Sequence, residues 1–92
     1  MTQGEYLQAR ALLLEREDEL NRALDRLQNA RKYRRGEAVI AARHEAEEAE
    51  RNLEQALAAA KRAWHEYWST KPNCRRDPEP ETSVLMRAEV II

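Results

Sequence analysis

The second half of this chain carries one continuous stripe of small apolar residues at helical spacing. Its members follow one another at alternating steps of three and four, which places them on one seam of an α-helix. The seam consists of Val39, Ala42, Ala46, Ala49, Leu53, Ala56, Ala60, Ala63 and Tyr67. Because most of these residues are alanines, a second helix can approach closely, near the lower end of the usual interaxial range of about 8–10 Å. The stripe predicts an all-α fold built on an antiparallel two-helix hairpin with alanine-rich, coiled-coil-like packing.

The first half of the chain supplies a matching seam. Thr2 and Glu5 stand at capping-box spacing, where each side chain can satisfy a backbone N–H of the first turn. The apolar positions that follow are Tyr6, Ala9, Leu13, Leu20, Ala23, Leu24 and Leu27. Arg16 interrupts them, and its aliphatic stem can lie along the seam while the guanidinium reaches water or an acidic neighbour. We therefore predict helices over 2–35 and 37–69.

A glycine separates the two seams. Gly36 follows a run of basic residues, and a glycine after a basic last turn is typical of a helix end in the left-handed conformation. The alternative is one continuous helix of about 65 residues, in which Gly36 would cost only about 1 kcal/mol. From Leu27 to Val39, a straight helix would rotate the seam by about 120°, whereas a turn resets its phase. The spacing therefore favours a hairpin with its turn near Gly36.

The last part of the chain differs from the two arms. Pro72 ends the second helix, because the residue before a proline avoids the helical region, so we assign the hairpin to 1–70 and a proline-containing linker to 71–81. The segment 82–92 alternates at Val84, Met86, Ala88, Val90 and Ile92. This alternation predicts an extended C-terminal tail with a β-strand, and a short helix is the alternative. Because a lone strand is unstable, we expect the tail to lie on its own hairpin, on a second copy or on a partner.

The short chain also predicts self-association. Its 92 residues form one domain at most, and two helices cannot enclose a deep core. Leu7, Ala11 and Leu14 lie outside the main seam, and apolar residues left outside a hairpin imply another partner. We predict that these residues carry self-association. Two hairpins would form a homodimer with a two-fold axis, which is a four-helix bundle.

The composition limits the classes of protein to which this chain can belong. Charged residues make up 36% of the sequence and the net charge is −1, which fits long solvated helices and gives no general argument for nucleic acid. The single cysteine, Cys74, cannot form an internal disulfide. We interpret it as a reduced, exposed thiol, although Arg75 and Arg76 beside it could make it reactive. No apolar run approaches the length of about 20 residues that is needed to span a bilayer. The N-terminus also lacks a signal-peptide pattern, so we expect a cytoplasmic protein without a membrane partner.

A basic run with a tyrosine at its centre occupies the predicted hairpin tip. It consists of Arg31, Lys32, Tyr33, Arg34 and Arg35, and Ile40 follows nearby. Basic groups around an aromatic ring can hold phosphates and stack on bases, and tyrosine and arginine are also favoured in protein contacts. We therefore predict partner contacts at Tyr33, Arg34, Arg35 and Ile40. The alternative is a solvated helix end that satisfies the helix dipole.

An acidic row follows one side of the second helix. Glu47, Glu50 and Glu54 are spaced by three and four residues, so their carboxylates lie on one face. Such a row resembles a line of phosphates and can attract a basic partner, such as a DNA-binding surface. We include these residues among the predicted partner-binding positions. The alternative is a solvated face on which Arg43 and Arg51 are the local partners.

Patterns for catalysis and metal binding fail at the spacing that each would require. His44 and Glu47 stand in the reverse order of the Glu-x-x-His repeat of di-metal bundles, and no second copy of the pair exists. His65 is not followed by a second histidine at helical spacing. No glycine-rich phosphate loop or activated nucleophile is evident, and an alanine seam leaves little room for a pocket. We predict a non-enzymatic protein with no metal and no cofactor.

A short, charged, alanine-rich hairpin over 2–69, with tyrosine and tryptophan near its ends, resembles the small phage-encoded anti-activators of quorum sensing. The resemblance implies a non-catalytic phage protein, acting in the cytoplasm of a bacterial host, that binds a LuxR-type transcription regulator at its DNA-binding domain. It rests on size and layout, transfers no functional residue, and does not account for 82–92. Two other classes stay open: nucleic-acid binding through the basic tip, and a structural, assembly or secretion-chaperone hairpin.

Overall fold

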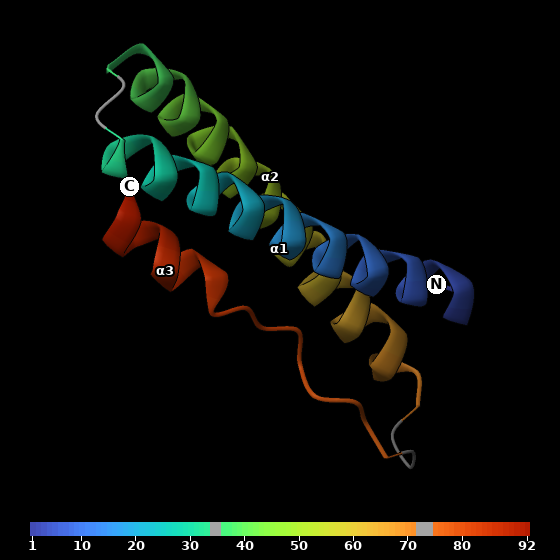
Figure 1. Ribbon diagram of the computed structural model, residues 1–92. Helices are drawn as coiled ribbons and strands as arrows, with labels where there is room; N and C mark the ends of the chain where they lie inside the picture. The colour runs from blue at the N-terminus through green and yellow to red at the C-terminus, as the bar shows by residue number, and fades with distance from the viewer. Residues whose placement is uncertain (34–35, 72–74) are drawn as a thin grey trace.

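The computed structural model describes residues 1–33, 36–71 and 75–92 of the chain. Within these segments the chain forms three helices, α1 (Gln3–Lys32), α2 (Gly36–Ser69) and α3 (Val84–Ile91). The two long helices lie side by side, and α3 lies beside the half of this pair nearest the connection between α1 and α2 (Figure 1). The Cα trace forms a rod of 55 × 18 × 13 Å.

Contacts at both ends of the rod show that α1 and α2 form a helical hairpin. Near the start of α1, the ring of Tyr6 stacks on that of Tyr67 near the end of α2, with 4.8 Å between the ring centroids. Towards the connection, Arg26 of α1 forms an ion pair with Glu45 of α2. The hairpin predicted from the two seams is therefore confirmed.

The predicted seams form the core of this hairpin. The buried members from α1 and α2 are Tyr6, Leu13, Leu20, Ala23, Leu24, Leu27, Ala42, Ala46, Leu53, Ala56, Ala60, Ala63 and Tyr67, and Ala9, Val39 and Ala49 are partly buried. The buried residues of α1 are mainly leucines and those of α2 are mainly alanines. Large side chains of one helix therefore fill the space beside small side chains of the other. Ala46 and Ala60 are completely buried, as expected for a helix pair that packs closely.

The start of α1 is capped as the sequence predicts. The Thr2 hydroxyl oxygen accepts a hydrogen bond from the Glu5 backbone N–H at 3.2 Å, and its hydroxyl lies 3.2 Å from the Glu5 carboxylate. The prediction for Arg16 is also confirmed, because its guanidinium donates to the Glu19 carboxylate at 2.8 Å while the side chain stays half-buried. This contact raises the pKa of Arg16 above its ordinary value, mainly through the hydrogen bond to Glu19.

The predicted role of Gly36 is wrong. The α1 helix ends at Lys32, and the Tyr33 N–H donates to the Asn29 carbonyl at 3.2 Å to close the last turn. Gly36 is instead the first residue of α2 and does not have the positive φ of a left-handed cap. A tyrosine ends α1 because the backbone there needs only φ −94° and ψ 5°, which any residue can adopt.

Between α2 and α3, residues 75–82 run along the hairpin as an extended segment. The Trp64 indole N–H donates to the Asp77 carbonyl at 2.8 Å, and the Arg10 guanidinium donates to the Pro78 carbonyl at 3.1 Å. Pro80 is completely buried. These contacts hold the linker against both long helices and place the following residues over the hairpin (Figure 1).

The predicted C-terminal strand is wrong, because the segment is the helix α3. Val84, Ala88 and Ile91 are spaced by four and three residues, and all three are buried in the hairpin core. A strand would have placed Met86 and Val90 on the buried face with Ala88, whereas both are exposed. The helix is more stable here than a lone strand, because it buries its apolar stripe on the hairpin core and satisfies its own backbone hydrogen bonds.

One arginine fixes the position of α3 on α1. The Arg87 guanidinium donates to Asn21 Oδ1 at 2.8 Å, to Asp25 Oδ1 at 2.6 Å and to Gln28 Oε1 at 3.3 Å. At the end of α3, the Ile91 carbonyl accepts a hydrogen bond from Arg31. These polar contacts occupy the side of α1 next to α3 and set the register between the two helices.

Candidate functional site

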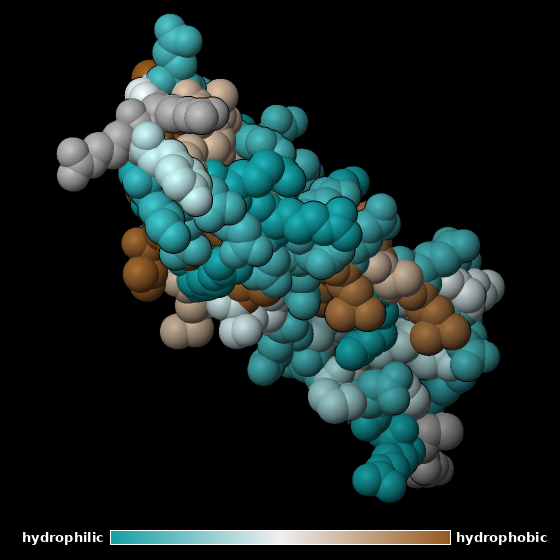
Figure 2. All heavy atoms as spheres, viewed as in Figure 1, coloured by the Kyte–Doolittle hydropathy of each residue, from teal (hydrophilic) through white to brown (hydrophobic). Residues whose placement is uncertain are grey.

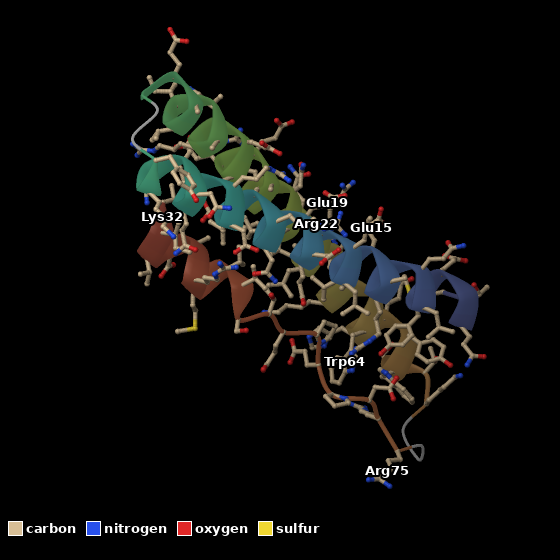
Figure 3. The ribbon with its side chains drawn as sticks, viewed as in Figure 1. Glu15, Glu19, Arg22, Lys32, Trp64 and Arg75 are labelled. Atoms are coloured by element: carbon tan, nitrogen blue, oxygen red, sulfur yellow. The ribbon has the colours of Figure 1, made fainter. Side chains whose placement is uncertain are left out.

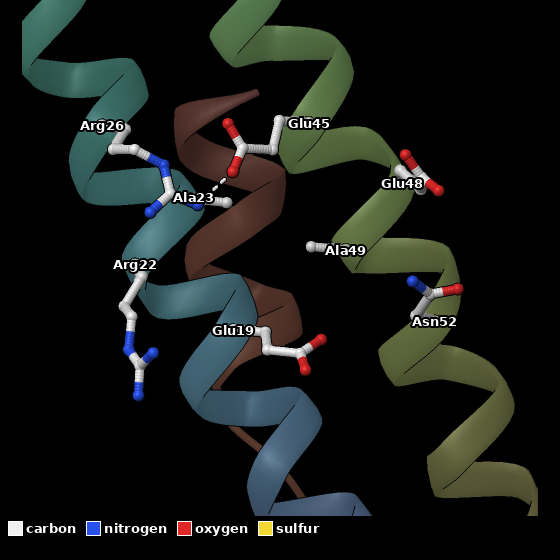
Figure 4. Close-up of a pocket in the computed structure, with 8 residues that line it drawn as sticks. All are labelled: Glu19, Arg22, Ala23, Arg26, Glu45, Glu48, Ala49 and Asn52. Carbon is white, nitrogen blue, oxygen red and sulfur yellow. Dashed lines mark hydrogen bonds and ion pairs between the residues drawn. The ribbon is translucent and has the colours of Figure 1, made fainter.

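A hairpin of two helices has two grooves, and only one of them is filled by α3. The opposite groove, here called the open groove, contains three hollows in a row along α1 and α2, with volumes of about 360, 260 and 250 Å³ from the tip inwards. Its floor consists of Ala23, Ala30, Ala38, Ala49, Ala56 and Ala59. Figure 4 shows the middle of this groove, with α3 behind the two long helices.

The two walls of the open groove carry opposite charges. Arg22 and Arg26 stand on the α1 wall, and Glu45 and Glu48 stand on the α2 wall. Arg26 forms an ion pair with Glu45 across the groove (Figure 4), whereas the Arg22 guanidinium pairs with Asp18 of its own helix. Arg22 and its neighbour Glu19 project from the side of α1 that faces away from α3 (Figure 3). The α1 wall also carries Glu19, which pairs with Arg16. The groove is therefore an apolar strip between an α1 wall with an excess of arginine, here called the basic wall, and an acidic α2 wall.

The hairpin tip exposes two of the four predicted contact residues. The Tyr33 side chain is 67% exposed, and the Lys32 ammonium lies 5.9 Å from the centroid of its ring. Ile40 is also exposed on the first turns of α2. Arg34 and Arg35 lie outside the described residues. Of the basic run, Arg31 donates to the α3 backbone and so contributes to the fold as well as to the charge of the tip.

The acidic row forms one surface with a residue that the sequence did not associate with it. Glu47 and Glu50 are half-buried and Glu54 is exposed. Burial raises the pKa of the Glu50 carboxyl, and the carboxylates around it raise it further, in the order Glu54, Glu89 and Glu47. Glu89 belongs to α3, so two elements contribute to this acidic surface. Arg51 acts in the opposite direction but does not cancel the increase.

Removing the charge of Glu50 is expected to stabilise the fold at neutral pH. Because its folded pKa lies above the unfolded value, the folded state holds the proton more tightly, and ionisation of Glu50 lowers stability as pH rises through the folded pKa. Glu50→Gln should therefore raise the urea midpoint at pH 7, and the difference should disappear as pH falls below the unfolded pKa.

The matched control for this experiment is Glu81→Gln, which changes an exposed carboxylate between α2 and α3 that belongs neither to the acidic row nor to the open groove. Its urea midpoint is expected to follow that of the unmodified chain across the same pH range. A Glu50→Gln midpoint that is lower at pH 7, or a difference that persists at low pH, would show that the folded state does not hold the Glu50 proton more tightly than the unfolded state.

The predicted self-association surface, here called the leucine face, is exposed. Leu7, Ala11 and Leu14 all face solvent, and Leu14 is 65% exposed. Figure 2 shows separate groups of apolar side chains on an otherwise hydrophilic face of the rod. Further along the same side of α1, Asn21 and Asp25 bind Arg87 of α3. The leucine face therefore ends where α3 begins, and self-association through it stays a prediction.

Sequence reasoning did not find the open groove or the outer face of α3. On α3, Met86 and Val90 are exposed, the latter at 87%. The helical set Val84–Ala88–Ile91 was the signal that could have identified α3. The groove was missed because Ala23, Ala49 and Ala56 of its floor were attributed to the contact between α1 and α2, and its other alanines were assigned to no surface. In the structure, Ala49 and Ala59 stay only half-buried at the groove floor.

The described residues contain no group of three histidine, cysteine, aspartate or glutamate side chains placed to hold a metal ion. Cys74 lies outside them. Among the described helices, none combines the length and the apolar character that a bilayer span requires. No protein-family model matches this chain, and comparison with curated proteins and with solved structures also finds no match.

Proposed function

We propose that this chain is a non-catalytic protein-binding module that acts by occlusion, covering a functional surface on a larger regulator. The observation that carries the proposal is the acidic surface formed by Glu47, Glu50, Glu54 and Glu89. Holding like charges around a half-buried carboxylate opposes folding, and local conflicts of this kind are expected where a surface serves function rather than stability.

The chemistry of this surface defines the partner. A line of carboxylates attracts a basic surface and accelerates its association, and it repels acidic partners. The surfaces that proteins use to hold DNA phosphates are basic, so a transcription regulator is the partner class that fits. The resemblance to phage-encoded anti-activators makes a LuxR-type regulator, bound at its DNA-binding domain, the first member of that class to test.

The exposed tip provides the apolar part of the proposed contact. Tyr33 and Ile40 are large, exposed and close to the connection between the helices. Aromatic residues supply much of the binding energy at protein interfaces, whereas charged residues supply selectivity and the rate of association. The proposal assigns affinity to the tip and selectivity to the acidic row.

We also propose that the active form is a homodimer, which would be a four-helix bundle of two hairpins. The supporting observations are the thin core and the half-buried alanines that stay open between α1 and α2, at Ala49 and Ala59. A two-fold dimer would present each binding surface twice. Two linked contacts strengthen binding to a dimeric regulator beyond the affinity of either contact alone.

Partner capture tests the proposed surfaces. The tagged chain is used to enrich proteins from a nuclease-treated bacterial lysate, and the enriched regulator is then purified and its affinity measured. Reversing Glu47, Glu50 and Glu54 to lysine, and separately Tyr33→Ala, is expected to weaken binding by about tenfold or more each, in line with the effect of central interface residues. Circular dichroism should show unchanged helicity.

The matched control carries the same change of net charge elsewhere: Glu15→Lys with Glu66→Lys and Glu81→Lys. These carboxylates are exposed and distant along the chain from the acidic row. If the control weakens binding as much as the acidic-row variant, net charge rather than the row determines affinity. If neither the row nor Tyr33 matters, the proposed surfaces are wrong.

A second candidate function is nucleic-acid binding at the tip, favoured by the exposed Tyr33 ring beside the Lys32 ammonium. A stacking ring next to a cation is a common single-strand binding arrangement. This function predicts binding that falls steeply as salt rises. A mobility-shift experiment that shows no complex even at low salt removes this candidate.

A further inference from the structure

We infer that the open groove is the surface on which a second copy of this chain docks, with the two-fold axis parallel to the rod. The inference rests on the proposed dimer and specifies its interface. Four features carry it: the limited extent of the leucine face, the length of the groove, its alanine floor and the charges of its walls.

The leucine face is too short to hold a stable dimer by itself. From Leu7 to Leu14 the helix advances by about 10 Å. Beyond this point the same side of α1 is polar, and α3 covers it through the contacts of Arg87. Stable dimers bury about 800 Å² on each partner, which a two-leucine patch next to a docked helix does not provide.

The open groove extends over most of the rod. Its hollows reach from Leu12 of α1 to Tyr33, the residue that follows α1, which corresponds to about 32 Å along the helix. Alanines form the floor throughout, so the backbone of an incoming helix can approach closely. The opposite groove of the same hairpin already accepts α3, with Ala88 completely buried at the contact. The hairpin therefore packs a helix into one groove and leaves an equivalent groove open.

The charges on the groove walls select a second copy as the occupant. The Arg26–Glu45 ion pair shows that these residues lie at the same level along the rod. One turn further along, Arg22 and Glu48 line the same hollow. A two-fold axis parallel to the rod, lying between the two copies, places the α1 wall of one copy over the α2 wall of the other. Each residue keeps its position along the rod under this rotation. Arg26 then faces Glu45 of the second copy, and Arg22 faces Glu48.

The alternative two-fold axis fails the same comparison. An axis perpendicular to the rod, in the plane between the two hairpins, would place α1 over α1 and α2 over α2. The basic walls would then face each other, as would the acidic walls, and like charges in contact oppose association. The wall charges thus fix the orientation of the two hairpins, while burial of the alanine floor supplies the affinity.

A bulky residue in the groove tests the interface against a neighbouring control. Ala59 lies on the groove floor and is half-buried, whereas Ala58 is exposed on the outer side of α2. Ala59→Trp is expected to raise the dimer dissociation constant by about tenfold or more, because it fills the space that the second copy needs. Ala58→Trp should leave that constant unchanged. Sedimentation velocity over a range of concentrations measures both, and circular dichroism confirms folding.

A charge exchange tests the orientation. The variant Arg22→Glu/Arg26→Glu has two acidic walls, and the variant Glu45→Lys/Glu48→Lys has two basic walls. Each variant alone is expected to be monomeric at concentrations where the unmodified chain is dimeric. Mixed in equal amounts, they should form a heterodimer that native mass spectrometry identifies by its mass, and this heterodimer should dissociate as salt is raised.

Three outcomes would overturn the inference. If Leu7→Gln/Leu14→Gln disrupts the dimer while Ala59→Trp does not, the second copy docks on the leucine face. If the two charge variants fail to pair when mixed, the proposed axis is wrong. If the unmodified chain is monomeric at about 50 µM, well above the dissociation constants of stable dimers, neither surface holds a second copy. Partner binding by that monomer would leave the proposed occlusion function standing.

Discussion

Leu24→Ala is expected to lower the free energy of unfolding by about 2–5 kcal/mol, as found when a buried leucine is cut back to alanine. Leu24 is completely buried in the core shared by α1, α2 and α3. The substitution removes apolar contacts and leaves a cavity that two long helices cannot close without shifting along their whole contact. For so small a protein this is a large part of the total stability.

Urea unfolding followed by circular dichroism measures this change, and Leu14→Ala is the matched control. Leu14 lies on the same helix but is 65% exposed, so its truncation should change stability by no more than about 0.5 kcal/mol. Equal effects at the two positions would mean that the assigned core is wrong. A change in the slope of the urea transition as well as in its midpoint would indicate an altered unfolded state rather than a cavity.

Ala60→Leu is expected to destabilise the protein by about 1–3 kcal/mol, because added methylene groups in a packed core force side chains and backbone apart. Ala60 is completely buried where α2 packs on the hairpin core. On an exposed helical surface, leucine and alanine have similar helix propensities. The loss in the free energy of unfolding at Ala60 therefore depends on how closely the two helices pack, and not on the helix propensity of α2.

The control for this substitution is Ala58→Leu, two residues away on the exposed side of α2. It should leave the urea midpoint almost unchanged. If Ala60→Leu is tolerated as well as Ala58→Leu, then α1 and α2 are not in close contact at this level, and the alanine seam does not have the packing role assigned to it.

The hairpin could be predicted from the sequence because its information is local and repeated. The seams of both arms recur at steps of three and four over many turns, so a single exception such as Arg16 does not obscure the pattern. The Thr2 cap is predictable for a similar reason, since its partner Glu5 is only three residues away. Features of this kind depend on the neighbouring residues of one helix and not on the final arrangement of the chain.

The C-terminal segment could not be predicted because two patterns coexist in it. Val84, Met86, Ala88 and Val90 alternate, whereas Val84, Ala88 and Ile91 have helical spacing. The helix forms because the hairpin provides a groove that accepts its apolar stripe. The hairpin also provides polar partners for Arg87. Those partners lie more than 50 residues away along the chain, and local periodicity contains no information about them.

The candidate surfaces were predicted in part. The acidic row and the exposure of Tyr33 follow from helical spacing, but the contribution of Glu89 depends on where α3 docks. Gly36 gave a misleading signal, because a glycine after a basic run is typical of a helix end and here it starts a helix. The open groove depends on which of two equivalent grooves α3 occupies, and that choice is a property of the folded chain.

The sides of the rod differ in what covers them. One groove is closed by α3, which completes the core, and the other is the groove in which we propose that a second copy docks. The acidic row lies outside that groove and is proposed to remain available for a partner on the dimer, whereas Tyr33 stands at the tip end of the groove.

The most direct test of occlusion is a mobility-shift titration of a purified LuxR-type regulator bound to its operator DNA. Increasing amounts of the unmodified protein are predicted to release the DNA, and the variant with Glu47, Glu50 and Glu54 reversed to lysine should fail to do so. If the regulator keeps its DNA at saturating protein, or if the variant releases the DNA equally well, the acidic surface does not act by occluding such a regulator.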